Sequence, residues 1–238
     1  MYYYRDWAGA EREFKRAIEL SPNYSEAHQL YGNYLAIRGR SEEGLAEKKK
    51  ALELEPLSVR LNRNLARAFY WKRDYDRAIE QYQKTLELAP NNAFTHILLG
   101  YAFEQKGMQK EAVAEWSKAL RLTGDNETAL MLTNDGEAAM LLERIFTTSG
   151  FDAAIRFLWQ RELEQLKEKT RRGEYVPAMN YALAYTRLAD KEQAFAWLAK
   201  AEQERSRLIY DVKLDPIYDS LRDDPRFLDL LRRVGLPQ

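Results

Sequence analysis

The stretch LARAFYWKRDYDRAIEQYQKTLELAP, residues 65–90, decides the fold because its pattern returns 34 residues later in LGYAFEQKGMQKEAVAEWSKALRLTG, residues 99–124. The same pattern comes earlier in YGNYLAIRGRSEEGLAEKKKALELEP, residues 31–56. Small, large apolar and chain-breaking residues recur in three columns: Ala10, Gly44, Ala78 and Ala112; Phe14, Lys48, Tyr82 and Trp116; Pro22, Pro56 and Pro90. Self-similarity at one fixed period of this length predicts an array of stacked helical hairpins.

Each column has a physical reason. A small residue such as Ala78 lets the two helices of a hairpin approach closely, and a large apolar residue such as Tyr82 fills the space between neighbouring hairpins. A proline ends the second helix, because it lacks a backbone N–H and disfavours helical geometry in the residue before it. Gly44 and Lys48 depart from their columns, so we expect the second unit to be the loosest of the regular ones.

These segments resemble tetratricopeptide repeats, and the resemblance covers residues 8–124, about half of the chain. It implies an all-α fold, an α-solenoid of helix-turn-helix hairpins wound into a right-handed superhelix. Residues 8–22 match only the second helix of a unit. We therefore expect the sequence to be a piece of a longer protein.

Beyond residue 124 the phase breaks, but the pattern returns more loosely. Residues 1–124 are predicted to hold the regular units, residues 125–205 two degenerate hairpins, and residues 206–238 a C-terminal capping segment, all in one continuous solenoid. The degenerate hairpins predict helices near 135–149, 152–170, 175–188 and 190–205. In the tail, Asp215 and Asp224 each precede a proline, an arrangement that begins helices, so two short helices are expected to cover the apolar end of the stack. This ending resembles the C-terminus of bacterial multidomain regulatory proteins that carry such repeats.

The composition disfavours several kinds of function. There are 37 basic and 37 acidic residues, which argues against a nucleic-acid binder, and there is no cysteine to ligate a metal. The start has no signal-peptide order and no apolar stretch is long enough to span a bilayer, so we expect no membrane contact and a cytoplasmic location. Lys48, Lys49 and Lys50 are expected to form a solvated helix face.

The sequence predicts no enzyme and no cofactor. It contains no metalloprotease, phosphate-loop or nucleophile-elbow motif. Its two histidines, His28 and His96, occupy one column 68 residues apart. Equivalent positions of separate units are too far apart to share a metal, so packing explains them better than catalysis does.

The resemblance implies that the first helix of each unit lines a concave face, which in the family holds extended peptides or partner helices. The predicted function is therefore a protein–protein interaction scaffold. One alternative is a regulatory segment of a larger signalling or transcription protein. Another is RNA binding, which the zero net charge disfavours, and a third is an enzyme site in residues 125–238, for which there is no motif. The oligomeric state stays open.

The resemblance also places particular residues on the concave face. In the unit that begins at Val59 these are Arg60, Arg63, Arg67, Tyr70 and Trp71. The three arginines share one helix face, where like charges repel, so an acidic peptide with apolar side chains would explain them. The rest of the predicted groove comes from the same unit and its neighbours: Asn33, Asn64, Phe94, Ile97 and Tyr101. The alternative is that the arginines pair with local acids across the groove.

Overall fold

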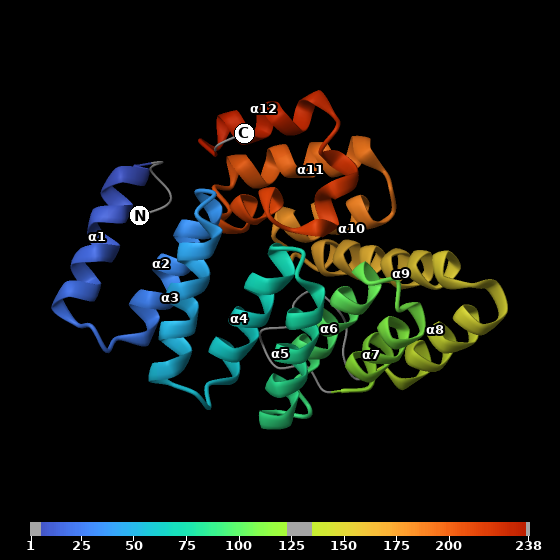
Figure 1. Cartoon of the computed structure of the whole chain (residues 1–238). Coiled ribbons are helices and arrows are strands. Elements are labelled where there is room, and N and C mark those ends of the chain that lie inside the picture. The colour runs from blue at the N-terminus through green and yellow to red at the C-terminus, as the bar shows by residue number, and fades with distance from the viewer. Residues whose placement is uncertain (1–5, 123–134, 237–238) are drawn as a thin grey trace.

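The computed structural model describes residues 6–122 and 135–236, and within these ranges it contains helices and no β-strand (Figure 1). Seven helices of similar length form residues 7–121: α1 (Trp7–Leu20), α2 (Ser25–Ile37), α3 (Ser41–Leu54), α4 (Val59–Trp71), α5 (Tyr75–Leu88), α6 (Ala93–Gln105) and α7 (Gln109–Arg121). The second half holds longer and shorter elements: α8 (Gly136–Ser149), α9 (Phe151–Arg171), α10 (Ala178–Arg187), α11 (Lys191–Gln203), η2 (Arg207–Lys213), η3 (Pro216–Leu221) and α12 (Pro225–Arg233). The predicted all-α helical-repeat fold is confirmed. Residues 125–134 of the predicted degenerate segment lie outside the described ranges.

The hairpins α2–α3, α4–α5 and α6–α7 pack through the small residues of the repeat. Ala78 and Ala112 are fully buried where their helices cross the partner helix. In the α2–α3 hairpin two glycines meet, and a Cβ on Gly32 would lie 2.8 Å from the backbone oxygen of Gly44. Gly44 therefore permits a backbone approach that no other residue allows, so it does not loosen the second unit at this crossing.

A hydrogen-bond network ties each linker to the hairpin that follows it. In the α2–α3 hairpin, His28 donates from Nε2 to the carbonyl of Pro22 at 2.9 Å, and its Nδ1 lies 2.6 Å from a carboxylate oxygen of Glu47. The same arrangement recurs in the α6–α7 hairpin with His96, Pro90 and Glu115. Both histidines therefore brace the linker against the second helix, as their shared column suggests.

The α4–α5 hairpin makes the equivalent network with amides. Asn62 occupies the histidine column, and its side-chain nitrogen donates to the carbonyl of Pro56 at 2.9 Å. Its side-chain oxygen accepts from Nε2 of Gln81 at 2.7 Å. The network is thus a property of the repeat position, and imidazole and amide both satisfy it.

The tail does more than cover the end of the stack. It packs on α10 and α11, but η2 also reaches back to the first half of the chain (Figure 1). Asp211 on η2 pairs with Arg67 on α4 at 2.5 Å, and Tyr210 meets Trp7 edge to face with ring centroids 5.2 Å apart. The prediction of two helices on the apolar end therefore missed the main placement. The tail consists of η2, η3 and α12, and it folds back over the concave side of the early hairpins.

Candidate functional site

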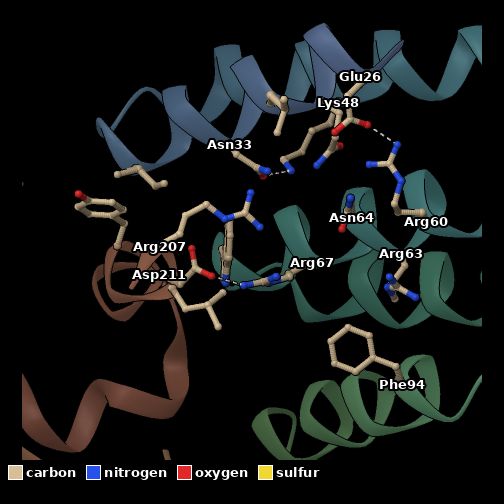
Figure 2. A pocket seen from close by; sticks show the side chains of 16 residues that line it. Glu26, Asn33, Lys48, Arg60, Arg63, Asn64, Arg67, Phe94, Arg207 and Asp211 are labelled. Carbon is tan, nitrogen blue, oxygen red and sulfur yellow. Dashed lines mark hydrogen bonds and ion pairs between the residues drawn. The ribbon is translucent and has the colours of Figure 1, made fainter. Parts of the chain in front are cut away.

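Two adjoining cavities lie between the first helices of the regular hairpins and the tail. The first, which we call the cationic cavity, has a volume of about 240 Å³ and lies between α2, α4, α6 and η2 (Figure 2). The second, which we call the aromatic cavity, has a volume of about 370 Å³ and lies between α4, α6, α10, η2 and η3. Arg67, Phe94, Leu208 and Asp211 line both cavities, so the two form one continuous groove.

All ten residues that the sequence placed in a groove line these cavities. The cationic cavity takes seven of them: Asn33, Arg60, Arg63, Asn64, Arg67, Trp71 and Phe94. The aromatic cavity takes Tyr70, Ile97 and Tyr101, together with the shared Arg67 and Phe94. The structure thus gathers the whole predicted set on one side of the helices α2, α4 and α6.

The three arginines of α4 have different surroundings. Arg60 pairs with Glu26 on α2, and Arg67 pairs with Asp211 (Figure 2). Arg63 is buried, with its guanidinium 4.8 Å from the centre of the Phe94 ring. For Arg60 and Arg67 the alternative reading holds, because both pair with acids across the groove. The second acid comes from the tail, which no repeat column could have indicated.

Lys48 is the residue of the site that sequence reasoning missed. It was expected on a solvated face, yet only 2% of it is exposed, whereas Lys49 and Lys50 are exposed as predicted. Its Nζ donates to Oδ1 of Asn33 at 2.5 Å, inside the cationic cavity (Figure 2). Burial, helped by the charge of Arg67, lowers the pKa of Lys48 to about 7.

The repeat itself held the signal for Lys48. Its column contains Tyr82 and Trp116, which are fully buried. A residue of that column points inward whatever its chemistry, so Lys48 had to bury its stem. Gly32 allows this, because a Cβ there would lie 2.9 Å from Cγ of Lys48.

The aromatic cavity combines rings with acids. The first half of the chain provides Tyr70, Tyr82 and Tyr101 as walls, and the tail provides Tyr218 and Asp215. The hydroxyls of Tyr70 and Tyr82 are buried and have no hydrogen-bond partner among the described residues. This cavity exists only because the tail folds back over the hairpins.

The structure gives no indication of a metal centre or a membrane segment in its described ranges. No three histidine, cysteine or carboxylate side chains among residues 6–122 and 135–236 gather closely enough to hold a metal ion. In the same part of the chain no helix combines the length and the apolar character needed to cross a bilayer.

Comparison with known proteins agrees with the geometry. Residues 13–46 match a family model described as tetratricopeptide repeat, and residues 67–107 match one described as TPR repeat. The chain contains tetratricopeptide repeats. No curated protein matches the sequence.

Among solved structures, the tetratricopeptide chain is similar to two repeat proteins. MamA is 19% identical over 70% of this chain and 92% of its own, with a TM-score of 0.52. A chain of the APC/C hetero-tetramer Cut9-Hcn1 is 15% identical over 98% of this chain and 43% of its own, with a TM-score of 0.54. At these identities the likeness concerns the fold alone, and it supports a helical-repeat architecture that extends into the second half.

Proposed function

We propose that this tetratricopeptide chain is a non-catalytic binding protein whose cationic cavity holds an extended acidic peptide of a partner protein. The observation that carries the proposal is the surplus of positive charge among the cavity's lining side chains. Five are basic and two are acidic: Lys48, Arg60, Arg63, Arg67 and Arg207 against Glu26 and Asp211. An acidic peptide would balance this surplus.

Lys48 strengthens the argument because stability does not favour it. Its column takes tyrosine or tryptophan in the neighbouring hairpins, and both are fully buried there. An amine in the same place loses hydration, and among the described residues its partner is the neutral amide of Asn33. A carboxylate entering the cavity would restore the lost stabilisation as a charge-assisted hydrogen bond.

The remaining walls fit the backbone and apolar side chains of such a peptide. Asn33 and Asn64 offer amides from successive hairpins, and the Phe94 ring and the half-exposed Leu208 offer apolar surface. Arg207 extends from η2 into the cavity (Figure 2). This combination supports an extended ligand that alternates acidic and apolar residues.

The test uses fluorescein-labelled peptides that alternate leucine with glutamate, and matched peptides that alternate leucine with lysine, measured by fluorescence anisotropy. The acidic series should bind and the basic series should not. Lys48→Met should weaken the acidic peptide roughly tenfold or more, since hydrogen bonds between charged groups are the strong ones. Lys49→Met changes an exposed neighbour in the same run and should leave the affinity unchanged.

Two outcomes would refute the proposal. One is equal binding of the acidic and basic series. The other is an unchanged affinity of Lys48→Met with a native circular dichroism spectrum. Reversing Arg67 is a poorer test, because its loss would also leave Asp211 without its partner.

A further inference from the structure

The aromatic cavity contains a carboxylate that no nearby cation balances. Asp215 lines this cavity, and its carboxylate accepts the backbone N–H of Ile217 at 3.1 Å. No lysine, arginine or histidine of the described ranges lies within ion-pair distance of that carboxylate. Arg222 comes near, but it contacts the backbone carbonyl of Asp215 and pairs with the carboxylate of Asp219.

The other buried charges around the cavity pair with each other. Arg67 pairs with Asp211 at 2.5 Å, and Arg187, behind the Tyr101 wall, pairs with Glu104 at 2.7 Å. Asp215 is left over, and its burial raises the pKa of its carboxyl. A carboxylate buried without a partner is costly, so stability does not account for a charge at this place.

Two hydroxyls add to this imbalance. Tyr70 is 4% exposed and Tyr82 is fully buried, and the hydroxyl of each lacks a hydrogen-bond partner among the described residues. Buried hydroxyls in folded proteins almost always have a partner. Both side chains line the aromatic cavity beside Tyr101 and Tyr218, so the missing partner would belong to whatever fills it.

Capping a helix explains only part of Asp215. Its side chain caps η3, but asparagine would cap equally well without burying a charge. An anionic occupant would meet Asp211 and Asp215 with one arginine between them, and it would be repelled. A cation would meet a free carboxylate, acceptor hydroxyl oxygens and aromatic faces, which together are the usual environment of a bound ammonium or guanidinium.

We propose that the aromatic cavity binds an organic cation on an apolar stem, namely the lysine or arginine side chain of the partner peptide. The assignment to a peptide rests on the proposed function, since the acidic residues of that peptide would lie in the adjoining cationic cavity. The cation would donate to the carboxylate of Asp215 and to the hydroxyls of Tyr70 and Tyr82, while its stem packs against Ile97 and Tyr101. The cavity volume of about 370 Å³ is in the range of sites that enclose such groups.

The first experiment requires no peptide, so its failure is distinct from failure of the proposed function. The intact chain is titrated with n-butylammonium and n-butylguanidinium, with n-butyrate and n-butanol as stem-matched controls, by ligand-detected NMR. The two cations should bind saturably at millimolar concentrations, as expected for very small ligands, and the two controls should not. Equal or tighter binding of butyrate, or no saturable binding of either cation, would overturn the proposal.

Two variants locate the site. Asp215→Asn keeps the cap and should weaken butylammonium tenfold or more, whereas Asp224→Asn makes the same change at the cap of α12 and should have no effect. Tyr82→Phe removes a hydroxyl without a partner, so it should leave the melting temperature unchanged or higher and weaken the cation several-fold. Unchanged affinity in both Asp215→Asn and Tyr82→Phe would reduce the cavity to packing and refute the site.

The second experiment tests the source of the cation. An acidic peptide with one lysine placed after its acidic run is compared with the same peptide carrying norleucine there. The lysine should raise the affinity roughly tenfold in the parent protein and not in Asp215→Asn. Equal affinities in the parent protein would overturn the assignment of this cavity to the peptide's basic side chain.

Discussion

The two halves of the chain use helices in different ways. From α1 to α7 each helix has 13 or 14 residues and each hairpin repeats the last one, down to the histidine or asparagine that holds its linker. From α8 onward the helices range from 9 to 21 residues and the 3₁₀ helices η2 and η3 appear. The first half is therefore an array of equivalent units, and the second is a set of individual elements.

The difference shows how a groove becomes a site. The periodic half presents a concave surface with an open side. The irregular half supplies that side through contacts between residues far apart in sequence, such as Arg67 with Asp211 and Arg73 with Asp219. Chemistry that the repeat cannot encode, such as the buried Asp215, enters the groove in this way.

The largest expected effect comes from breaking the connection between the halves. Arg187 on α10 pairs with Glu104 on α6, and the two side chains are 10% and 14% exposed. Arg187→Ala would leave Glu104 as a nearly buried charge without a partner, at a cost of about 3–5 kcal/mol. Urea unfolding measures it.

A surface pair is the control for this change. Arg171→Ala removes an exposed partner of Glu168 and should cost less than about 1 kcal/mol. Equal losses for the two variants would mean that the halves are not joined at Arg187. Combining Arg187→Met with Glu104→Gln should restore much of the stability, because neither buried charge then remains.

The next effect tests the periodic half. Ala78 is fully buried at the crossing of α4 and α5, so Ala78→Leu should overpack it and cost about 1–3 kcal/mol. Lys84→Leu on the same helix changes an exposed residue that pairs with Glu80 and should cost less than about 1 kcal/mol. Thermal melts compare the two, and equal midpoints would contradict the column assignment.

The same contrast explains what the sequence could predict. The seven helices of the first half followed from columns such as Ala78 and Tyr82, whose roles repeat and reinforce one another. The groove residues followed too, because Arg60, Arg63 and Arg67 occupy fixed places on a helix whose orientation the repeat determines. Even Lys48 was within reach, since its column points inward and only its charge argued for solvent.

The tail could not be predicted in this way. Asp211 meets Arg67 once, across 144 residues, and a single pair has no period to reveal it. The Asp-Pro pairs indicated where its short helices begin, which η3 and α12 confirm. They carried no information on which surface those helices cover. Asp215 therefore looked like a cap, and its place in the cavity followed only from the fold.

A smaller effect tests the irregular half. Glu162 on α9 is 5% exposed, and burial raises its pKa to about 8 from an ordinary value near 4.5. Between these values the unfolded chain has released the proton and the folded chain retains it, so stability falls as the pH rises. Glu162→Gln should remove this loss and stabilise the protein by on the order of 1 kcal/mol at pH 8.5, with little effect at pH 4.

The matched control for Glu162 lies two residues further along α9. Glu164 is exposed and pairs with Lys167, so Glu164→Gln should not stabilise the protein at either pH. Urea titrations at the two pH values give the comparison. A stabilisation of Glu162→Gln that is equal at both would show that the carboxyl does not titrate in this range.

The smallest expected effect concerns the pH dependence of binding to the cationic cavity. Lys48 has a pKa of about 7 in the free protein, where burial and the charge of Arg67 both disfavour its proton. A peptide carboxylate beside it would raise that pKa, so above pH 7 the complex must take up a proton to form. The affinity for the acidic peptide should therefore fall several-fold between pH 6.5 and pH 8.5, while the peptide's own carboxylates stay ionised throughout. Lys48→Met should bind more weakly and lose this slope, and Lys49→Met should keep it. An affinity that rises with pH, or an identical slope in Lys48→Met, would place the titrating group elsewhere and remove Lys48 from the binding step.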